Sequence, residues 1–135
     1  MHTTDYRSTF IEVAEDCPVA AAEAPPSKAV PTVAELQFDM ISAAPFAHTS
    51  DDVVFGVHAD RQGIPQDERA AAREAFFAKG QPCMRSSPLT KRYGWGVLSD
   101  PEGRVALVAL GTTEYAERAA DPELAHTRGM RSSRR

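Results

Sequence analysis

The sequence predicts an α+β fold in a single domain: a small, mainly antiparallel sheet of about four strands, two main helices packed on one face, and a short C-terminal helix. Three observations predict it. The chain has 135 residues, 42% of them apolar, which suffices for one core without a metal or disulfides. Strand-like and helix-like segments are interspersed along it. A hairpin signal in the C-terminal half requires an antiparallel strand pair.

The first strand is followed by a long loop. Residues 9–13 have strand composition, with Ile11 and Val13 on one face. Residues 14–31 contain four prolines and no hydrophobic period, which predicts an irregular connection. The length of this loop makes it a candidate functional segment.

A helix is predicted over residues 33–43. Thr32 can accept the amide of Glu35 while the Glu35 carboxylate returns to the amide of Thr32, which is the capping-box arrangement. Apolar residues at helical spacing follow, and Pro45 prevents continuation.

The next two elements are predicted to be a strand and a helix. Residues 53–58, Val-Val-Phe-Gly-Val-His, form the strongest β-type run in the chain. A helix is expected from Pro65 to Lys79, because proline suits a first helical turn and the charges near both ends match the helix dipole. Gly80 is expected to end this helix in the left-handed conformation.

A short capped helix and a hairpin are predicted next. Ser87 can cap one or two helical turns that have Pro88 at the first position and end at Gly94. Residues 95–99 and 104–110 flank a turn with proline and glycine, which predicts a β-hairpin.

The C-terminal part is expected to contain a short helix and a tail. Thr112 or Thr113 can cap a helix over residues 114–120, and at most another turn is expected beyond Pro122. The domain is therefore predicted to span residues 1–127, followed by an arginine-rich flexible tail over residues 128–135.

Charge is distributed unevenly along the chain, whose net charge is -4. Residues 1–60 contain ten carboxylates and two cations, whereas residues 128–135 contain four arginines and no acid. Such a tail can pair with nucleic-acid phosphates, but at the end of an acidic chain it is more often a solvated tail, so nucleic acid is not the favoured partner. No signal-peptide pattern opens the chain and no apolar run has the length of a membrane span, so a cytoplasmic location without membrane association is expected.

The candidate site lies in residues 80–96, which combine a thiol, three cations, three hydroxyls and two aromatic rings. The hydroxyls and the amides at the start of the short helix suit a phosphate, sulfate or carboxylate. No phosphate-loop motif is present, so the class of the anionic small molecule or acidic partner stays open. Alternatively, the cations pair with the acidic first half and the aromatic rings complete the core. The predicted ligand-binding residues are Arg85, Ser86, Ser87, Lys91, Arg92 and Trp95.

A second hypothesis makes Cys83 a nucleophile or redox thiol. Arg85 and nearby amides would stabilise its thiolate, and His58 is the best candidate base. The alternative is that Cys83 is a satisfied, partly buried residue. Cys17 and Cys83 are both expected to stay thiols, because no export signal places them in an oxidising compartment.

The sequence supports two further interpretations. The same basic loop and the tail would serve a protein or nucleic-acid interaction module. Asp51 and Asp52, with other acids in the same half, suggest a site for a hard metal ion or for acid-base chemistry. Adjacent aspartates, however, more often cap helices or end strands. Neither a metal site nor a cofactor is predicted, and the sequence leaves the oligomeric state open.

The chain has distinctive segments at residues 9–14, 16–18, 50–53 and 79–96. Together they resemble a family of short bacterial proteins catalogued only as a domain of unknown function. The similarity covers nearly the whole chain and implies a stand-alone, single-domain, cytosolic bacterial protein. It implies no activity, cofactor or catalytic residue.

Overall fold

The computed structural model describes residues 1–133. Its elements, in chain order, are β1 (Thr9–Glu12), α1 (Val33–Ala43), α2 (Ser50–Gln62), the 3-10 turn η1 (Gln66–Glu68), α3 (Arg69–Phe76), the 3-10 turn η2 (Met84–Ser86), α4 (Pro88–Lys91), β2 (Trp95–Ser99), β3 (Val105–Ala109), α5 (Thr113–Ala119) and β4 (Ala125–Arg128).

The four strands form one mixed sheet in the order β3-β2-β1-β4. β2 is antiparallel to both β1 and β3, while β1 and β4 run parallel. In the central pair Phe10 lies opposite Leu98. The α+β class and the mainly antiparallel sheet are therefore confirmed.

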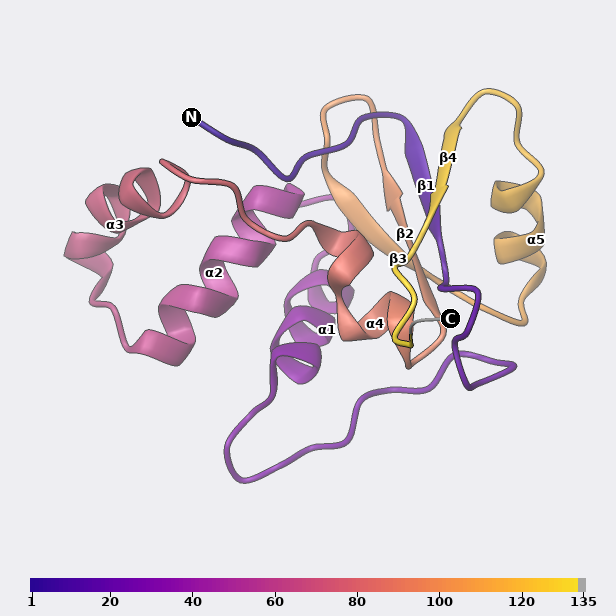
Figure 1. Ribbon diagram of the computed structural model, residues 1–135, viewed down its shortest axis with the longest axis horizontal. Coiled ribbons are helices and arrows are strands. Elements are labelled where there is room, and N and C mark those ends of the chain that lie inside the picture. Colours follow the sequence, from indigo (N-terminus) through magenta and orange to yellow (C-terminus); the bar gives the residue numbers. More distant parts are fainter. Residues whose placement is uncertain (134–135) are drawn as a thin grey trace.

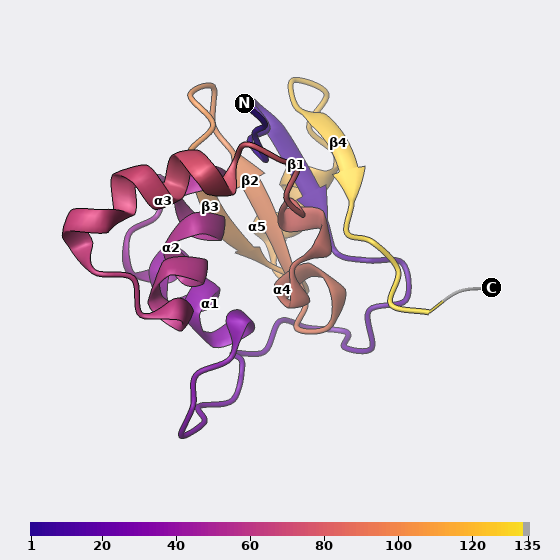
Figure 2. The ribbon, with the colours of Figure 1, turned by 60° about the vertical axis from the view of Figure 1, so that its left-hand side comes forward.

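Helices cover both faces of this sheet, as the two views in Figure 1 and Figure 2 show. On one face Ile11 and Val97 pack with residues of α1, α2, η2 and α4 in the largest core cluster. On the other face Phe10 packs edge to face with Tyr115 of α5, at 5.1 Å between ring centroids. α3 lies beyond α2 and contacts that helix, so the second expected main helix does not pack on the sheet.

The strand predicted at residues 53–58 is wrong, because these residues belong to helix α2. The helix begins with a capping box: the Thr49 hydroxyl accepts the Asp52 amide at 3.1 Å, and the Asp52 carboxylate accepts the Thr49 amide at 3.0 Å. Residues two apart on a helix point to nearly opposite sides. Val53 faces the sheet core and Phe55 faces α3, so burial alternates as it does in a strand.

The fourth strand is β4, where at most a helical turn was expected. Its residues pair with β1, and the expected domain boundary after residue 127 falls inside it. The chain stays attached beyond the strand, since the Gly129 amide donates to the Glu12 carbonyl and the Ser132 amide donates to Asp16. Residues 134 and 135 of the expected tail lie outside the described residues.

Local expectations are confirmed at most other elements. Thr32, Ser87 and Thr112 cap α1, α4 and α5, and the hairpin forms between β2 and β3. Two details differ. The Glu35 carboxylate accepts the amide of Lys28 in the long loop, so the box at α1 is half formed. Gly80 is not left-handed, and α3 ends earlier than expected, at Phe76.

The long loop over residues 14–31 has no regular element. It connects β1 to α1 along the lower edge of the molecule in Figure 1. Within residues 1–133 no helix is both long and apolar enough to cross a bilayer.

Candidate functional site

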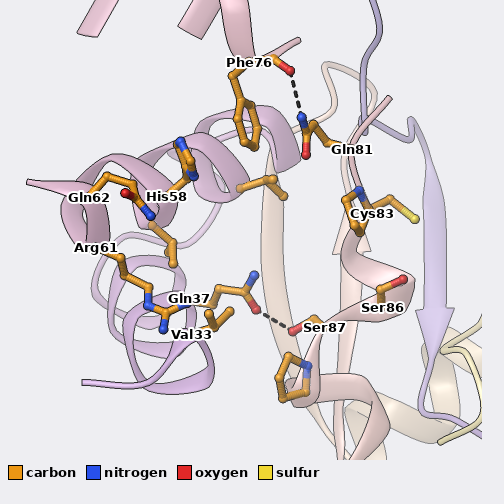
Figure 3. A pocket seen from close by; sticks show the side chains of 14 residues that line it. Val33, Gln37, His58, Arg61, Gln62, Phe76, Gln81, Cys83, Ser86 and Ser87 are labelled. Atoms are coloured by element: carbon orange, nitrogen blue, oxygen red, sulfur yellow. Dashed lines mark hydrogen bonds between the residues drawn. The ribbon is translucent and has the colours of Figure 1, made fainter. Parts of the chain in front are cut away.

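A cleft of about 290 Å³ opens between α2, the segment over residues 81–88, and the first turns of α1 (Figure 3). Four of the residues singled out in the sequence line it together: His58, Cys83, Ser86 and Ser87. Valine, proline and phenylalanine side chains supply its apolar surface. Its size lies near the lower end of small-molecule pockets, which span about 300–1,000 Å³.

Helix α2 supplies one whole wall of this cleft. Val54, Val57, His58 and Arg61 all line it, and their spacing places them on one helical face. The His58 ring lies 4.6 Å from the Phe76 ring, between centroids, and makes no hydrogen bond within residues 1–133. Arg61 was missed because its place beside His58 is visible only once residues 50–62 are recognised as helical.

Gln37 of α1 is the most buried polar group of the cleft that has an unused donor. The residue is only 7% exposed. Oε1 accepts the Ser87 hydroxyl at 2.5 Å, and the Ser87 oxygen in turn accepts the Leu89 amide at 3.1 Å. Nε2 donates to no group among the described residues, and Figure 3 shows it pointing into the cleft. The sequence gives no signal for this residue, which appears as one polar position in a helix.

The lining of the cleft includes no carboxylate among its fourteen residues. Arg61 is its permanent positive charge, lies exposed in the last turn of α2, and forms no ion pair within residues 1–133. The chain as a whole has a net charge of -4. The lining of the cleft therefore carries one positive charge and no negative charge, on a protein that is acidic as a whole.

The amides at the start of α4 do not serve as ligand donors, contrary to the expectation from the sequence. Leu89 donates to the Ser87 hydroxyl, and Thr90 and Lys91 both donate to the Ser87 carbonyl. The amides of Ser86, Ser87, Arg92 and Tyr93 are also bonded to nearby carbonyls. Ser87 itself is occupied by capping and by Gln37, so its role is structural first.

The other predicted binding residues lie outside the cleft. Arg85 points to the opposite side, where its Nε donates to the Arg128 carbonyl at 2.6 Å beside the C-terminal segment. Trp95 donates to the Glu23 carbonyl at 2.9 Å and packs on Phe38, so it holds the long loop in place.

Lys91 and Arg92 do not line the cleft either. Arg92 is exposed, and Lys91 is partly buried. No ion pair joins either of them, or Arg85, to an acid among the described residues. The six predicted binding residues therefore do not converge on one cavity.

Cys83 and His58 line the same cleft without facing each other. Figure 3 shows the Cys83 sulfur turned away from His58. The Sγ atom lies 3.4 Å from the hydroxyl oxygen of Tyr6. Burial and this hydrogen bond raise the pKa of Tyr6 above its ordinary value, and Arg85 opposes the shift. Cys17 lies against a different core cluster, and both cysteines are free thiols.

The acidic residues near the start of α2 have structural partners. The buried Asp51 carboxylate accepts the Thr3 hydroxyl and both the amide and the hydroxyl of Thr4, which attaches the N-terminal segment. Asp52 caps α2 and pairs with Arg73 of α3 at 2.8 Å. Within residues 1–133 no three metal-ligating side chains gather as a metal ion would require.

Comparisons with known proteins bear on family alone. No match is found among the curated proteins, and none among the solved structures. A family model described as a family of unknown function (DUF6157) matches residues 1–135, so the chain belongs to that family.

Proposed function

We propose that the protein binds a small anionic molecule in the cleft between α2 and residues 81–88. The observation that carries the proposal is the set of donors that face this cleft without an acceptor. Gln37 Nε2 has no hydrogen-bond partner among the described residues, and it is open to solvent in the cleft although the residue as a whole is more than nine-tenths buried. A ligand acceptor can therefore take the place of the water that reaches this donor.

Electrostatics supports an acceptor that is negatively charged. Arg61 contributes a permanent positive charge, and the lining contains no carboxylate to compensate it. His58 adds a ring that can donate a hydrogen bond or stack on a planar group. A cationic ligand would meet only unfavourable charge in this cleft.

The size of the cleft favours a small molecule over a macromolecular partner. It holds about 290 Å³, and its apolar surface is concave rather than spread over the outside of the protein. Part of the segment over residues 80–96 lines it, through Cys83, Ser86 and Ser87. The binding cation, however, is Arg61 of α2 rather than Arg85, Lys91 or Arg92.

The proposal is tested by thermal unfolding in the presence of a panel of small organic and inorganic anions. A ligand present at 100 times its Kd stabilises the folded state by about 2.7 kcal/mol, which is easily detected. The stabilisation at the same anion concentration should be smaller in Arg61→Ala, because the affinity is several-fold weaker. Arg92→Ala is the matched control, because it removes the same charge from an exposed position outside the cleft.

Two outcomes would contradict the proposal. One is a panel in which no anion raises the melting temperature. The other is a stabilisation of equal size in the wild type and in Arg61→Ala, which would place the anion elsewhere.

A further inference from the structure

We infer that the anionic group recognised in the cleft is a carboxylate on a compact apolar body, rather than a phosphate. This inference rests on the proposed function and narrows it to one ligand class. Two features of the cleft support it: the start of α4 has no free amides, and the lining carries a single permanent charge.

Phosphate sites in proteins are commonly built from free backbone amides at a helix start or in a tight turn. Beside this cleft the amides from residue 86 to residue 93 are used internally, apart from Pro88, which has none. The amides of Gln81 and Cys83, which line the cleft on either side of Pro82, make no hydrogen bond within residues 1–133. The start of α4 therefore offers no ring of free amides to replace the hydration of a phosphate, although single amides remain beside it.

The charge of the cleft matches one negative charge better than two. Arg61 is the one permanently charged side chain among the lining residues. A phosphate monoester carries about 1.5 to 2 negative charges near neutral pH. A carboxylate carries one, and its two oxygens fit the planar donors of a guanidinium and an amide.

Gln37 and Arg61 lie at the same end of the cleft. In Figure 3 they line one end, while His58 and Phe76 line the other. The carboxylate is therefore placed between Gln37 Nε2 and the Arg61 guanidinium. The apolar body then lies against the Phe76 and His58 rings.

The experiment compares probes that share an apolar body and differ in their polar group. The probes are 3-phenylpropanoate, 3-phenylpropanamide and phenyl phosphate, with inorganic phosphate as a fourth, each titrated into the full-length protein by calorimetry. The propanoate should bind, and the amide should bind about tenfold or more weakly, because a hydrogen bond to a charged group is lost. Both phosphates should bind more weakly than the propanoate.

Two variants locate the carboxylate. Gln37→Glu keeps an acceptor for Ser87 but replaces the free donor with a negative charge, so propanoate binding should be lost. Arg61→Ala should weaken it several-fold, with Arg92→Ala unchanged as the control. Because a buried glutamate can destabilise the fold, the melting temperature of Gln37→Glu is measured first, and the exposed Arg61→Ala carries the test if that variant unfolds.

The outcomes separate this inference from the proposed function. If phenyl phosphate binds more tightly than the propanoate and depends on Arg61, the carboxylate assignment is overturned while anion binding stands. If the amide binds as tightly as the propanoate, the charge is irrelevant and both proposals fail. Both also fail if none of the four probes binds.

Discussion

Replacing Asp52 by alanine should lower the free energy of unfolding by about 2 kcal/mol, because one carboxylate holds both the start of α2 and its contact with α3. One oxygen accepts the Thr49 amide at 3.0 Å, and the other accepts Nη1 of Arg73 at 2.8 Å. The capping contact contributes about 1 kcal/mol. The favourable position at the positive end of the helix dipole adds about 0.3–1 kcal/mol.

The ion pair with Arg73 adds little to this sum. Its two side chains are 34% and 37% exposed, so solvent screens the charges and the pair contributes about 0.2–1 kcal/mol.

Unfolding entropy of about 2.1 cal/mol/K per residue gives about 0.28 kcal/mol/K for this chain. A loss of 2 kcal/mol therefore lowers the melting temperature by about 7 °C.

The assay is urea unfolding followed by circular dichroism, with Arg73→Ala and the double variant to isolate the ion pair. The double-mutant cycle should give a coupling of about 0.2–1 kcal/mol. A total effect of Asp52→Ala below about 0.5 kcal/mol would refute the reasoning, because the helix would then not depend on this cap.

The effect should also depend on pH. Burial raises the pKa of Asp52, but the Thr49 amide and the Arg73 guanidinium outweigh burial and hold the pKa below its ordinary value of 3.8. The contribution of the carboxylate is therefore present above pH 3.8 and is lost as the pH falls through the lower folded-state pKa. The difference in stability between the wild type and Asp52→Ala should shrink below pH 3.8.

Two further predictions test other parts of the fold. Gly96→Ala should lower the free energy of unfolding by about 1–3 kcal/mol through overpacking. The added Cβ would lie 2.7 Å from the Phe10 ring and 3.0 Å from Tyr115. An unchanged melting temperature would contradict the packing of α5 on the sheet. Asp16 accepts a hydrogen bond from the Ser133 amide. This hydrogen bond is the largest of the causes that hold the pKa of the Asp16 carboxyl below its ordinary value. Hydrogen exchange of the Ser133 amide, relative to its intrinsic rate, should therefore be faster in Asp16→Asn than in the wild type. In the wild type it should also become faster as the pH falls below 3.8. Equal protection of this amide in both proteins at neutral pH would show that the carboxylate does not hold this segment.

The sequence predicted elements where local chemistry decides the structure. The helix over residues 33–43 follows from a cap, a hydrophobic stripe and a proline stop, and it has the expected bounds. The hairpin follows from a turn that needs Gly103, which has a φ of 83°. Both signals lie within a few residues of the element they specify.

The errors arose where tertiary contacts decide the structure. Residues 53–58 alternate in burial because α2 is covered on two sides, so a period of two appears in a helix. β4 has no hydrophobic pattern because its residues lie at the exposed edge of the sheet, and pairing with β1 makes it a strand. No pattern in the local sequence indicates either of these tertiary contacts.

The candidate site was found in part for the same reason. Cys83, Ser86 and Ser87 line the cleft, as the cluster of functional groups suggested, but its wall on α2 could not be recognised from a predicted strand. The Nε2 donor of Gln37 points into the cleft because Oε1 of the same amide accepts a hydrogen bond from Ser87, which lies fifty residues away in the sequence. Contacts over this distance in sequence depend on the completed fold.

The most direct test of anion binding in the cleft is the affinity of 3-phenylpropanoate for Arg61→Ala and for Arg92→Ala, measured by calorimetry against the wild type. Both variants lose one positive charge from an exposed position, so general electrostatic attraction changes equally. We predict that binding weakens several-fold in Arg61→Ala and is unchanged in Arg92→Ala. Equal affinities in all three proteins, or a loss confined to Arg92→Ala, would contradict the assignment of the cleft.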